Sequence, residues 1–435
     1  MKRRQFLQLT ALAAAPAPSR PPNFIILFAD DMGYGDLACY GHPTLRTPKI
    51  DRLAAEGTRF TSFYAAAAVC TPSRVGLLTG RYPSRAGQPN NTGSDTIGGL
   101  PLSEILLPQL LKPRGYKTMA IGKWHLGFQP APYLPTSRGF DAWFGLPYSN
   151  DMIPPRVKTD RLLHLYRNTD MVERVTDQSN LTPRYTDEAI KFIKAFKASP
   201  FFLYVPYAMP HLPVSVPKDR QGRSRAGHYG DVIETLDWSV GEILRTLKEE
   251  GLDQNTMVVF ASDNGPWHDL PPRMLAEGVE PWHTGSTGLL RGSKGTSYEG
   301  GPRVPGIVRW PGTVRPGQVS QDLASTLDLL PTILDAAQIP LPKDRVYDGK
   351  SLLPHLRDGH PSPRQEYFYH LGKVLEAVRQ GPWKYRQGKQ SPPELFHLDR
   401  DPAERYNVAP QNPDLVAKLA ARLKAFAAEV HADLN

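Results

Sequence analysis

Continuous apolar runs alternate along this chain with segments whose apolar residues recur every three or four positions. The runs at residues 24–29, 200–205 and 256–262 contain almost no polar residue before their last position. Such runs are typical of strands that are buried on both faces of a parallel sheet. Residues 182–196 and 229–250 have the spacing of amphipathic helices instead. The pattern predicts an α/β fold with a large, mixed, mostly parallel sheet sandwiched by helices.

The pattern changes toward the end of the chain. Residues 377–385 and 394–398 alternate between apolar and polar positions, which predicts short antiparallel strands. Residues 413–430 then have helical spacing. We therefore expect a large domain over residues 21–345 and a smaller C-terminal α+β domain over residues 346–435, with an antiparallel sheet and a terminal helix.

The first nineteen residues have the composition of an export signal. Arg3-Arg4 precedes Phe6-Leu7 and a short apolar run that ends in small residues, as in a twin-arginine signal peptide. This run is too short to span a bilayer, and no other segment is apolar enough to do so. The sequence predicts a periplasmic or secreted protein without stable membrane insertion. An unstructured terminus is the alternative.

The net charge of +9 includes three positive charges within residues 1–19. A basic protein attracts anionic ligands over long distances. Because the chain has no run rich in lysine and arginine and no nucleic-acid motif, we expect no nucleic-acid partner. Its two cysteines, Cys39 and Cys70, give no disulfide framework if Cys70 is chemically modified.

Polar residues follow two of the predicted strands directly. Asp30 and Asp31 end the first apolar run, and Asp263 and Asn264 end the run at residues 256–262. Ligands of open α/β sheets bind beyond the carboxyl ends of the strands. Carboxylate and amide oxygens there suit a divalent cation such as Ca²⁺ or Mg²⁺. For an isolated pair of aspartates, a capped turn is the alternative.

Three further basic or titratable residues follow predicted strands. Lys123 and His125 come after the strand at residues 117–121 and, if extended, point to one face. His211 follows the strand at residues 200–205. Together they could bind an anion and transfer a proton. Taken singly, a solvated lysine and packed or surface histidines are the favoured interpretation.

Cys70 begins a predicted helix that continues to Thr79 and ends at Gly80. Pro72 suits its first turn, and Arg74 lies one turn beyond the cysteine. A cysteine at a helix N-terminus beside a cation is expected to have a lowered pKa and to be a possible nucleophile. A cysteine that only packs in the core is the alternative.

Three sequence motifs in this chain resemble motifs of one known protein family. Cys70-Thr71-Pro72-Ser73-Arg74 with Leu78-Thr79-Gly80 resembles the signature of the type I sulfatases. Lys123-Trp124-His125-Leu126-Gly127 and Gly292-Ser293-Lys294-Gly295-Thr296-Ser297-Tyr298-Glu299-Gly300-Gly301 resemble two more motifs of that family. The resemblance extends from about Pro22 into the C-terminal region. It is strongest to members of the arylsulfatase A and N-acetylgalactosamine-6-sulfatase type.

The resemblance implies an alkaline-phosphatase-like fold and a covalent mechanism. Cys70 would be oxidised to Cα-formylglycine by a formylglycine-generating enzyme, and the aldehyde hydrate would attack the sulfur of a sulfate monoester. His211 would protonate the leaving alcohol, and His125 would take the hydrate proton during elimination. Arg74 would hold the hydrate. The substrate would be a sulfated sugar or an aryl sulfate.

The resemblance also implies the binding residues. Lys123 and Lys294 would stabilise charge on the sulfate oxygens, and Ser149 would contact the sulfate. The family's Ca²⁺ ligands match Asp30, Asp31, Cys70, Asp263 and Asn264, and Mg²⁺ is possible. Two alternatives remain open: a phosphomonoesterase or phosphodiesterase-like relative with the same architecture, and an inactive protein that binds sulfated glycans.

Overall fold

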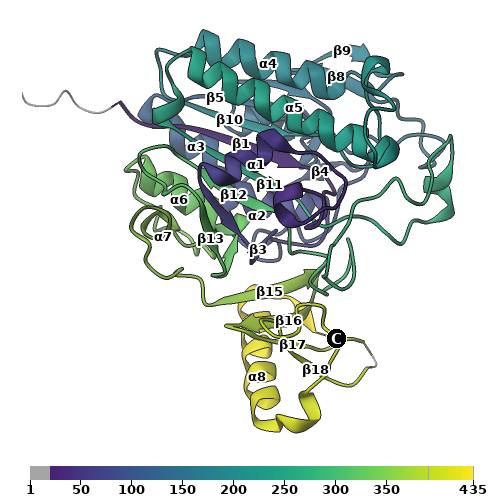
Figure 1. The fold of residues 1–435 in the computed structure, drawn as a ribbon, viewed down its shortest axis with the longest axis vertical. Helices are drawn as coiled ribbons and strands as arrows, with labels where there is room; N and C mark the ends of the chain where they lie inside the picture. Colours follow the sequence, from purple (N-terminus) through teal and green to yellow (C-terminus); the bar gives the residue numbers. More distant parts are fainter. Residues whose placement is uncertain (1–19, 390, 435) are drawn as a thin grey trace, which may run out of the picture.

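The computed structural model describes residues 20–389 and 391–434, and the predicted export signal at residues 1–19 lies outside them. A large domain with a central sheet contacts a smaller domain made of a sheet and one long helix (Figure 1). The predicted fold class is confirmed. Within the described residues, no helix is both long and apolar enough to cross a membrane.

The large sheet has ten strands in the order β13-β2-β12-β11-β1-β10-β5-β7-β8-β9. Its five central strands are parallel, as their apolar runs predict. They are β11 (Thr256–Ser262), β1 (Asn23–Ala29), β10 (Phe201–Pro206), β5 (Lys117–Ile121) and β7 (Ala142–Gly145). Because the strands are parallel, their carboxyl ends lie at one edge of the sheet, where the candidate residues follow.

The outer strands are mostly antiparallel. They are β12 (Gly306–Arg309), β2 (Thr58–Phe60) and β13 (Gln318–Ser320) on one side, and the hairpin β8 (His164–Arg167) and β9 (Asp170–Arg174) on the other. Residues 59–64 alternate between polar and apolar positions, which predicts one strand, but the structure does not form a single strand there. The segment divides at Thr61, whose N–H bonds Ser320, and the chain continues as β3 (Phe63–Tyr64) beside β14 (Ala324–Ser325) in a separate sheet.

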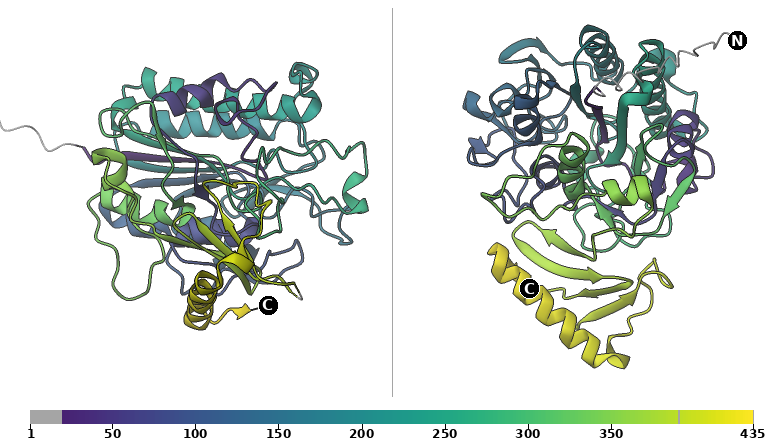
Figure 2. Two further views of the ribbon diagram at one scale, coloured as in Figure 1. Left: turned by 60° about the horizontal axis from the view of Figure 1, so that its bottom comes forward. Right: turned by 90° about the vertical axis from the view of Figure 1, so that its left-hand side faces the viewer.

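Two helical layers cover the large sheet (Figure 2). Ile25 and Leu27 of β1 face one core, and Phe24 and Ile26 face the other. The first layer contains α1 (Pro48–Ala55), α4 (Leu181–Ala195) and α5 (Gly227–Glu249); the second contains α2 (Cys70–Thr79), α3 (Leu107–Leu111), α6 (Leu329–Ala336) and α7 (Leu353–Asp358). A short pair, β4 (Gly98–Gly99) and β6 (Gly127–Gln129), lies outside these layers.

The smaller domain is an antiparallel sheet with α8 (Pro413–Val430) packed against it, as the alternating pattern predicts (Figure 2). Its strands are β15 (Glu366–Leu371), β16 (Val374–Gln380), β17 (Trp383–Arg386) and β18 (Glu394–His397), with β19 (Asp433–Leu434) parallel to β16. Helix α7 packs in the core of the large domain through Leu353 and Leu356. The domain boundary at residue 346 stays a prediction.

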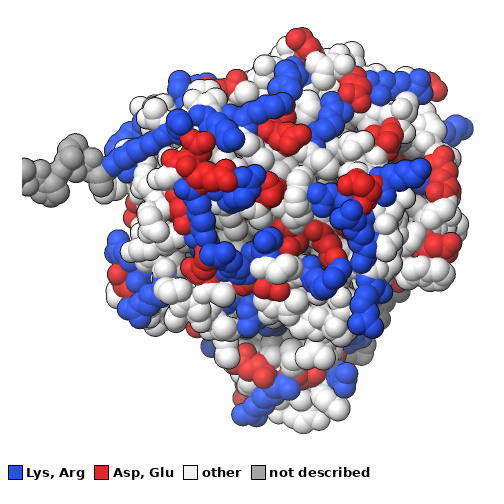
Figure 3. Space-filling model, turned by 45° about the horizontal axis from the view of Figure 1, so that its top comes forward, with Lys and Arg blue, Asp and Glu red and all other residues white. Residues whose placement is uncertain are grey.

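Basic and acidic side chains are interspersed over the face of the molecule shown in Figure 3. That face therefore has no continuous basic field of the kind that nucleic acid binds.

Candidate active site

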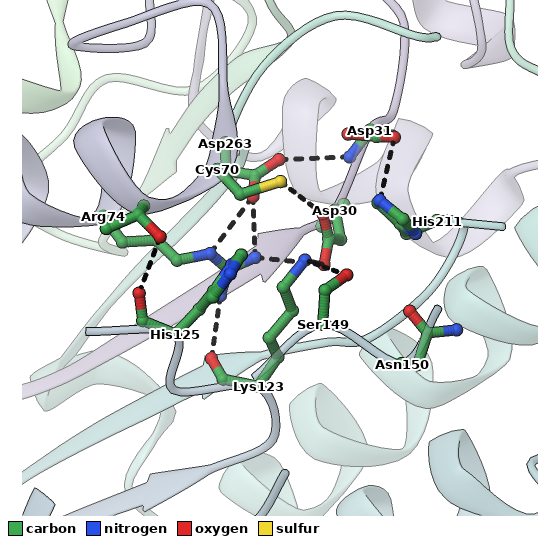
Figure 4. Close-up of polar contacts among 12 residues, drawn as sticks. Asp30, Asp31, Cys70, Arg74, Lys123, His125, Ser149, Asn150, His211 and Asp263 are labelled. Atoms are coloured by element: carbon green, nitrogen blue, oxygen red, sulfur yellow. Dashed lines mark hydrogen bonds and ion pairs between the residues drawn. The ribbon is translucent and has the colours of Figure 1, made fainter. Parts of the chain in front are cut away.

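The two acidic strand ends meet at the carboxyl edge of the large sheet. Ala29 of β1 pairs with Ser262 of β11, so the residues that follow each strand lie side by side. The Asp31 N–H donates to Asp263 Oδ1 at 3.1 Å (Figure 4). Asn264 Nδ2 donates to Asp31 Oδ1 at 2.6 Å. The structure thus brings these residues together, as the sequence predicts.

Helix α2 brings Cys70 to this cluster. The helix begins at Cys70 and ends at Gly80, whose φ of 66° is the left-handed conformation that glycine adopts easily. Cys70 Sγ lies 3.6 Å from Asp30 Oδ1 and 3.4 Å from Lys294 Nζ. A lysine from a distant loop therefore contacts the sulfur directly.

Arg74 faces the carboxylates rather than the sulfur. Its Nη2 lies 2.7 Å from Asp263 Oδ2 and 3.2 Å from Asp30 Oδ2, and its Nη1 donates to the Lys123 carbonyl at 2.8 Å. The side chain is fully buried. Arg74 thus fixes the positions of two carboxylates and of the segment that carries Lys123.

The expected activation of the Cys70 thiol by its helix and by Arg74 is wrong. Burial raises the pKa of Cys70, and the charges of Lys123 and Lys294 only partly oppose this effect. The side chain is therefore a neutral thiol near pH 7 and a poor nucleophile as it stands.

Two lysines bind the aspartates from opposite sides. Lys123 Nζ lies 2.5 Å from Asp30 Oδ2 and donates to Ser149 Oγ at 3.0 Å. Lys294 Nζ lies 2.7 Å from Asp31 Oδ1. Burial would raise the pKa of Asp30, but the positive charges of Lys123 and Arg74 hold it below its ordinary value. Asp30 thus stays ionised beside its two cations, whereas burial and the neighbouring Asp30 raise the pKa of Asp263.

A glycine allows Lys123 to reach this position. A Cβ on Gly122 would lie 1.9 Å from the Pro206 carbonyl oxygen, and Gly122 has a φ of 128°. The next residue, Lys123, donates its N–H to the same oxygen at 2.7 Å. This close approach ties the end of β5 to the end of β10.

The two histidines lie in different environments. His211 Nε2 is 3.5 Å from Asp31 Oδ2, and its Nδ1 is 2.6 Å from the Leu212 carbonyl oxygen. His125 Nε2 contacts the Thr92 carbonyl oxygen at 2.8 Å, while its Nδ1 is buried without a hydrogen-bond partner. Burial, aided by Lys123 and Arg74, lowers the pKa of His125 well below its ordinary value, so the imidazole is neutral.

The extended conformation expected for Lys123 to His125 is wrong at His125. Its φ of 57° lies in the left-handed region. The Lys123 and Trp124 N–H groups bond carbonyls of different neighbouring segments, Pro206 and Leu146, and the chain turns after them.

The donor set fits a hard divalent cation. Ligand atoms of Asp30, Asp31, Cys70 and His211 lie within 4.8 Å of one another. Asn264 Oδ1 is buried without a hydrogen-bond partner, which leaves an acceptor free for a cation. The carboxylate oxygens of Asp30 and Asp31 and the amide oxygen of Asn264 suit Ca²⁺ or Mg²⁺. Both oxygens of Asp263 already accept hydrogen bonds, from Asp31 and Arg74, so its direct ligation stays a prediction.

No role was predicted for Asp151, which also lies here. It is buried, and its Oδ1 has no hydrogen-bond partner. Burial would raise its pKa, but His211 and a Ser149 hydrogen bond hold it lowered. Asp151 is a carboxylate in the segment that follows β7, and this position could have marked it as a candidate site residue.

Comparisons with known proteins identify the family of the chain. The sulfatase family model matches residues 22–339, and the model of the N-sulphoglucosamine sulphohydrolase C-terminal region matches residues 293–429. The chain belongs to the type I sulfatase family, as the motifs predict. It is accordingly an enzyme of the sulfuric ester hydrolase class.

Individual relatives show how far the likeness extends. N-acetylgalactosamine-6-sulfatase of Rattus norvegicus is 40% identical over 92% of this chain and 83% of its own length. Arylsulfatase A of Homo sapiens is 39% identical over 92% and 86%. A solved structure from work on glycosaminoglycan metabolism by Bacteroides thetaiotaomicron has a TM-score of 0.82 and 31% identity, covering 94% of this chain and 99% of that one.

Proposed function

We propose that this sulfatase hydrolyses sulfate monoesters of a sugar or an aryl alcohol through a formylglycine at position 70 and a bound Ca²⁺ ion. The observation that carries the proposal is the place of Cys70, in contact with both Asp30 and Lys294. Because burial raises the pKa of its thiol there, an unmodified cysteine would be a weak nucleophile.

When oxidised, residue 70 supplies an aldehyde hydrate as the nucleophile toward sulfur, in place of a thiol. A Ca²⁺ ion held by Asp30, Asp31, Asp263, Asn264 and residue 70 supplies charge stabilisation when bound; Mg²⁺ is the alternative ion. Arg74 positions Asp30 and Asp263 for this purpose.

The remaining side chains bind the ester and move protons. Lys123, Lys294 and Ser149 surround the place of the sulfate oxygens and stabilise their negative charge. His211 gives a proton to the leaving alcohol oxygen. His125, neutral and with a free Nδ1, accepts the hydrate proton when sulfate is expelled.

Maturation and location are part of the proposal. A formylglycine-generating enzyme oxidises Cys70, and the twin-arginine-like segment exports the protein to the periplasm or beyond. The names of the relatives favour a sulfated sugar as substrate.

Two measurements on protein from the native host test the proposal. Mass spectrometry of the peptide with residue 70 should show the aldehyde, and a chromogenic aryl sulfate should be turned over faster than its phosphate counterpart. Faster phosphate hydrolysis would establish the phosphoesterase alternative. An unmodified thiol in active protein would refute the mechanism, and glycan binding without sulfate release would favour the inactive binding protein.

Metal removal gives an independent prediction. Treatment with a chelator should abolish sulfate release and lower the melting temperature, and Ca²⁺ should restore both. At a hundredfold excess over its Kd, the ion adds about 2.7 kcal/mol of stability. Comparison with Mg²⁺ at equal concentration identifies the preferred ion, and unchanged activity in the chelated protein would exclude a metal role.

A further inference from the structure

The loop that carries Lys294 contacts both domains. The Lys294 and Gly295 N–H groups donate to carbonyl oxygens of the large domain, those of Pro266 and Ala68, each at 2.9 Å. The loop then contacts the smaller domain through three consecutive side chains, those of Ser297, Tyr298 and Glu299. Lys294 therefore lies three residues from a contact between the domains.

Ser297 is bound by two charged side chains of the smaller domain. Its hydroxyl donates to Glu376 Oε2 on β16 at 2.6 Å and accepts from Arg386 Nε on β17 at 2.8 Å. Arg386 Nη2 lies 3.4 Å from the same oxygen of Glu376. Ser297 is 2% exposed, so water has little access to replace these partners. The three side chains form a closed set of contacts across the domain boundary.

Arg386 also contacts the next residue of the loop. The central carbon of its guanidinium lies 4.3 Å from the centre of the Tyr298 ring, in a cation–π contact. Its Nη1 donates to Glu394 on β18 at 2.6 Å, and the Tyr298 hydroxyl donates to Glu394 at 3.2 Å. Arg386 thus contacts two consecutive residues of the loop, while two carboxylates of its own domain fix the orientation of its guanidinium.

Glycines flank Lys294 in the loop. Gly292 and Gly295 have φ angles of 73° and 77°, in the left-handed region. A Cβ on Gly295 would meet no atom within 4 Å, so no neighbour packs against that side of the backbone. Glycine also loses more conformational freedom on folding than any other residue. An ordered position for Lys294 therefore depends on contacts that the loop makes beyond these glycines, including those with the smaller domain.

Lys294 is sensitive to the position of its loop. Its Nζ lies 2.7 Å from Asp31 Oδ1, 2.8 Å from Asp31 Oδ2 and 3.4 Å from Cys70 Sγ. A lysine side chain has many rotamers, so an accurate position of its ammonium requires a fixed backbone. A displacement of about 1 Å at a reacting centre can lower a rate about a hundredfold.

We propose that Arg386 and Glu376 are positioning residues: through Ser297 they hold the loop so that Lys294 meets the sulfate group of the substrate. The smaller domain then acts on the reaction without touching the substrate. The proposal rests on the proposed function for the role of Lys294, and it adds residues from outside the catalytic cluster to that function.

The test compares two variants that each remove an ion pair of the smaller domain. Arg386→Met removes the contacts with Glu376 and with the loop, and Arg422→Met removes the pair between α8 and Glu366 of β15. In the oxidised enzyme, we expect Arg386→Met to lower kcat/KM for an aryl sulfate about tenfold, mainly through KM, because Lys294 contacts the sulfate before and during the reaction. Arg422→Met is the control for domain stability and should change kcat/KM less than about twofold.

A double-mutant cycle shows whether Arg386 acts through Lys294. Because Lys294→Ala removes the group that is positioned, adding Arg386→Met to it should lower kcat/KM less than about twofold further. An equal loss in both backgrounds, or an equal rise in KM with Arg422→Met, would overturn the positioning role. An unchanged KM in Lys294→Ala would instead refute the sulfate-binding role that the proposed function gives to this lysine.

A crystal structure of the Ser297→Ala protein decides the positioning independently of activity. This variant removes one hydroxyl and leaves both charged partners in the smaller domain, so it tests the link where Arg386→Met fails to fold. We expect Lys294 Nζ to move by about 1 Å or more from its place beside residue 70, the scale on which catalysis responds. An unmoved and equally ordered Lys294 would overturn the proposal, whatever the substrate of the enzyme.

Discussion

Among the buried clusters of charged residues in the described part of the chain, the active-site cluster and an interdomain cluster differ in how their polar atoms are paired. The interdomain cluster consists of Glu299, Arg303, Arg379, Lys384 and Glu404 with the hydroxyls of Tyr64 and Tyr369. Glu299 Oε1 accepts from Tyr369 at 2.6 Å and Lys384 at 3.0 Å, and Oε2 accepts from Arg303 at 3.3 Å and from Tyr64. Both oxygens of Glu299 are therefore satisfied.

The active-site cluster is incomplete by comparison. Asn264 Oδ1, His125 Nδ1 and Asp151 Oδ1 are all buried without a hydrogen-bond partner. Buried polar atoms are normally paired, so several orphans in one place indicate a site that a ligand completes. The paired cluster indicates a structural role, and Glu299 also lies five residues from Lys294 in the same loop.

The sharpest contrast should come from Cys70→Ala. Loss of the nucleophile should lower kcat for an aryl sulfate by about 10⁴-fold or more, with little change in the free energy of unfolding. Activity is measured as released sulfate and stability by urea denaturation. The matched control is Cys39→Ala, which removes the other cysteine and should retain activity. Substantial turnover by Cys70→Ala would contradict the assignment of the nucleophile.

The interdomain cluster should respond in the opposite way to Lys384→Met. This change leaves Glu299 and Glu404 buried without their shared cation, which is 3.0 and 2.7 Å from them. Breaking a buried pair costs about 3–5 kcal/mol, so the urea midpoint should fall markedly. The exposed Lys373→Met serves as the control in the same domain. Equal stabilities of the two variants would show that the cluster contributes little.

The sequence predicted the active-site cluster far better than the interdomain cluster, for a physical reason. Asp30 and Asp263 each follow an apolar run, and parallel strands bring such ends together, so their meeting follows from the pattern. Lys384 lies within a strand of the smaller domain, and its pairing with Glu299 of the large domain depends on how the two domains pack. The contacts of Arg74 could not be predicted from the sequence either. Helical spacing places Arg74 one turn beyond Cys70 but does not determine which side chains its guanidinium contacts.

The pH dependence of stability gives the finest comparison. Burial would raise the pKa of Glu299, but Lys384, Arg303 and Arg379 lower it to about 2, against 4.5 for the free side chain. A depressed pKa means that the folded state holds the ionised form. Its contribution is therefore complete above about pH 4.5 and is lost as the pH falls toward 2.

The stability difference between wild type and Glu299→Gln should accordingly shrink on acidification, by at most about 1.4 kcal/mol per pH unit for one proton. Urea denaturation from pH 6 to pH 3 measures it, with the exposed Glu173→Gln as a control that should show no such trend. A difference that does not vary with pH would mean that Glu299 gains nothing from its cations. Glu299 shares a loop with Lys294, so the interdomain cluster helps to position this active-site lysine. We therefore expect Glu299→Gln also to raise the KM for an aryl sulfate at pH 7.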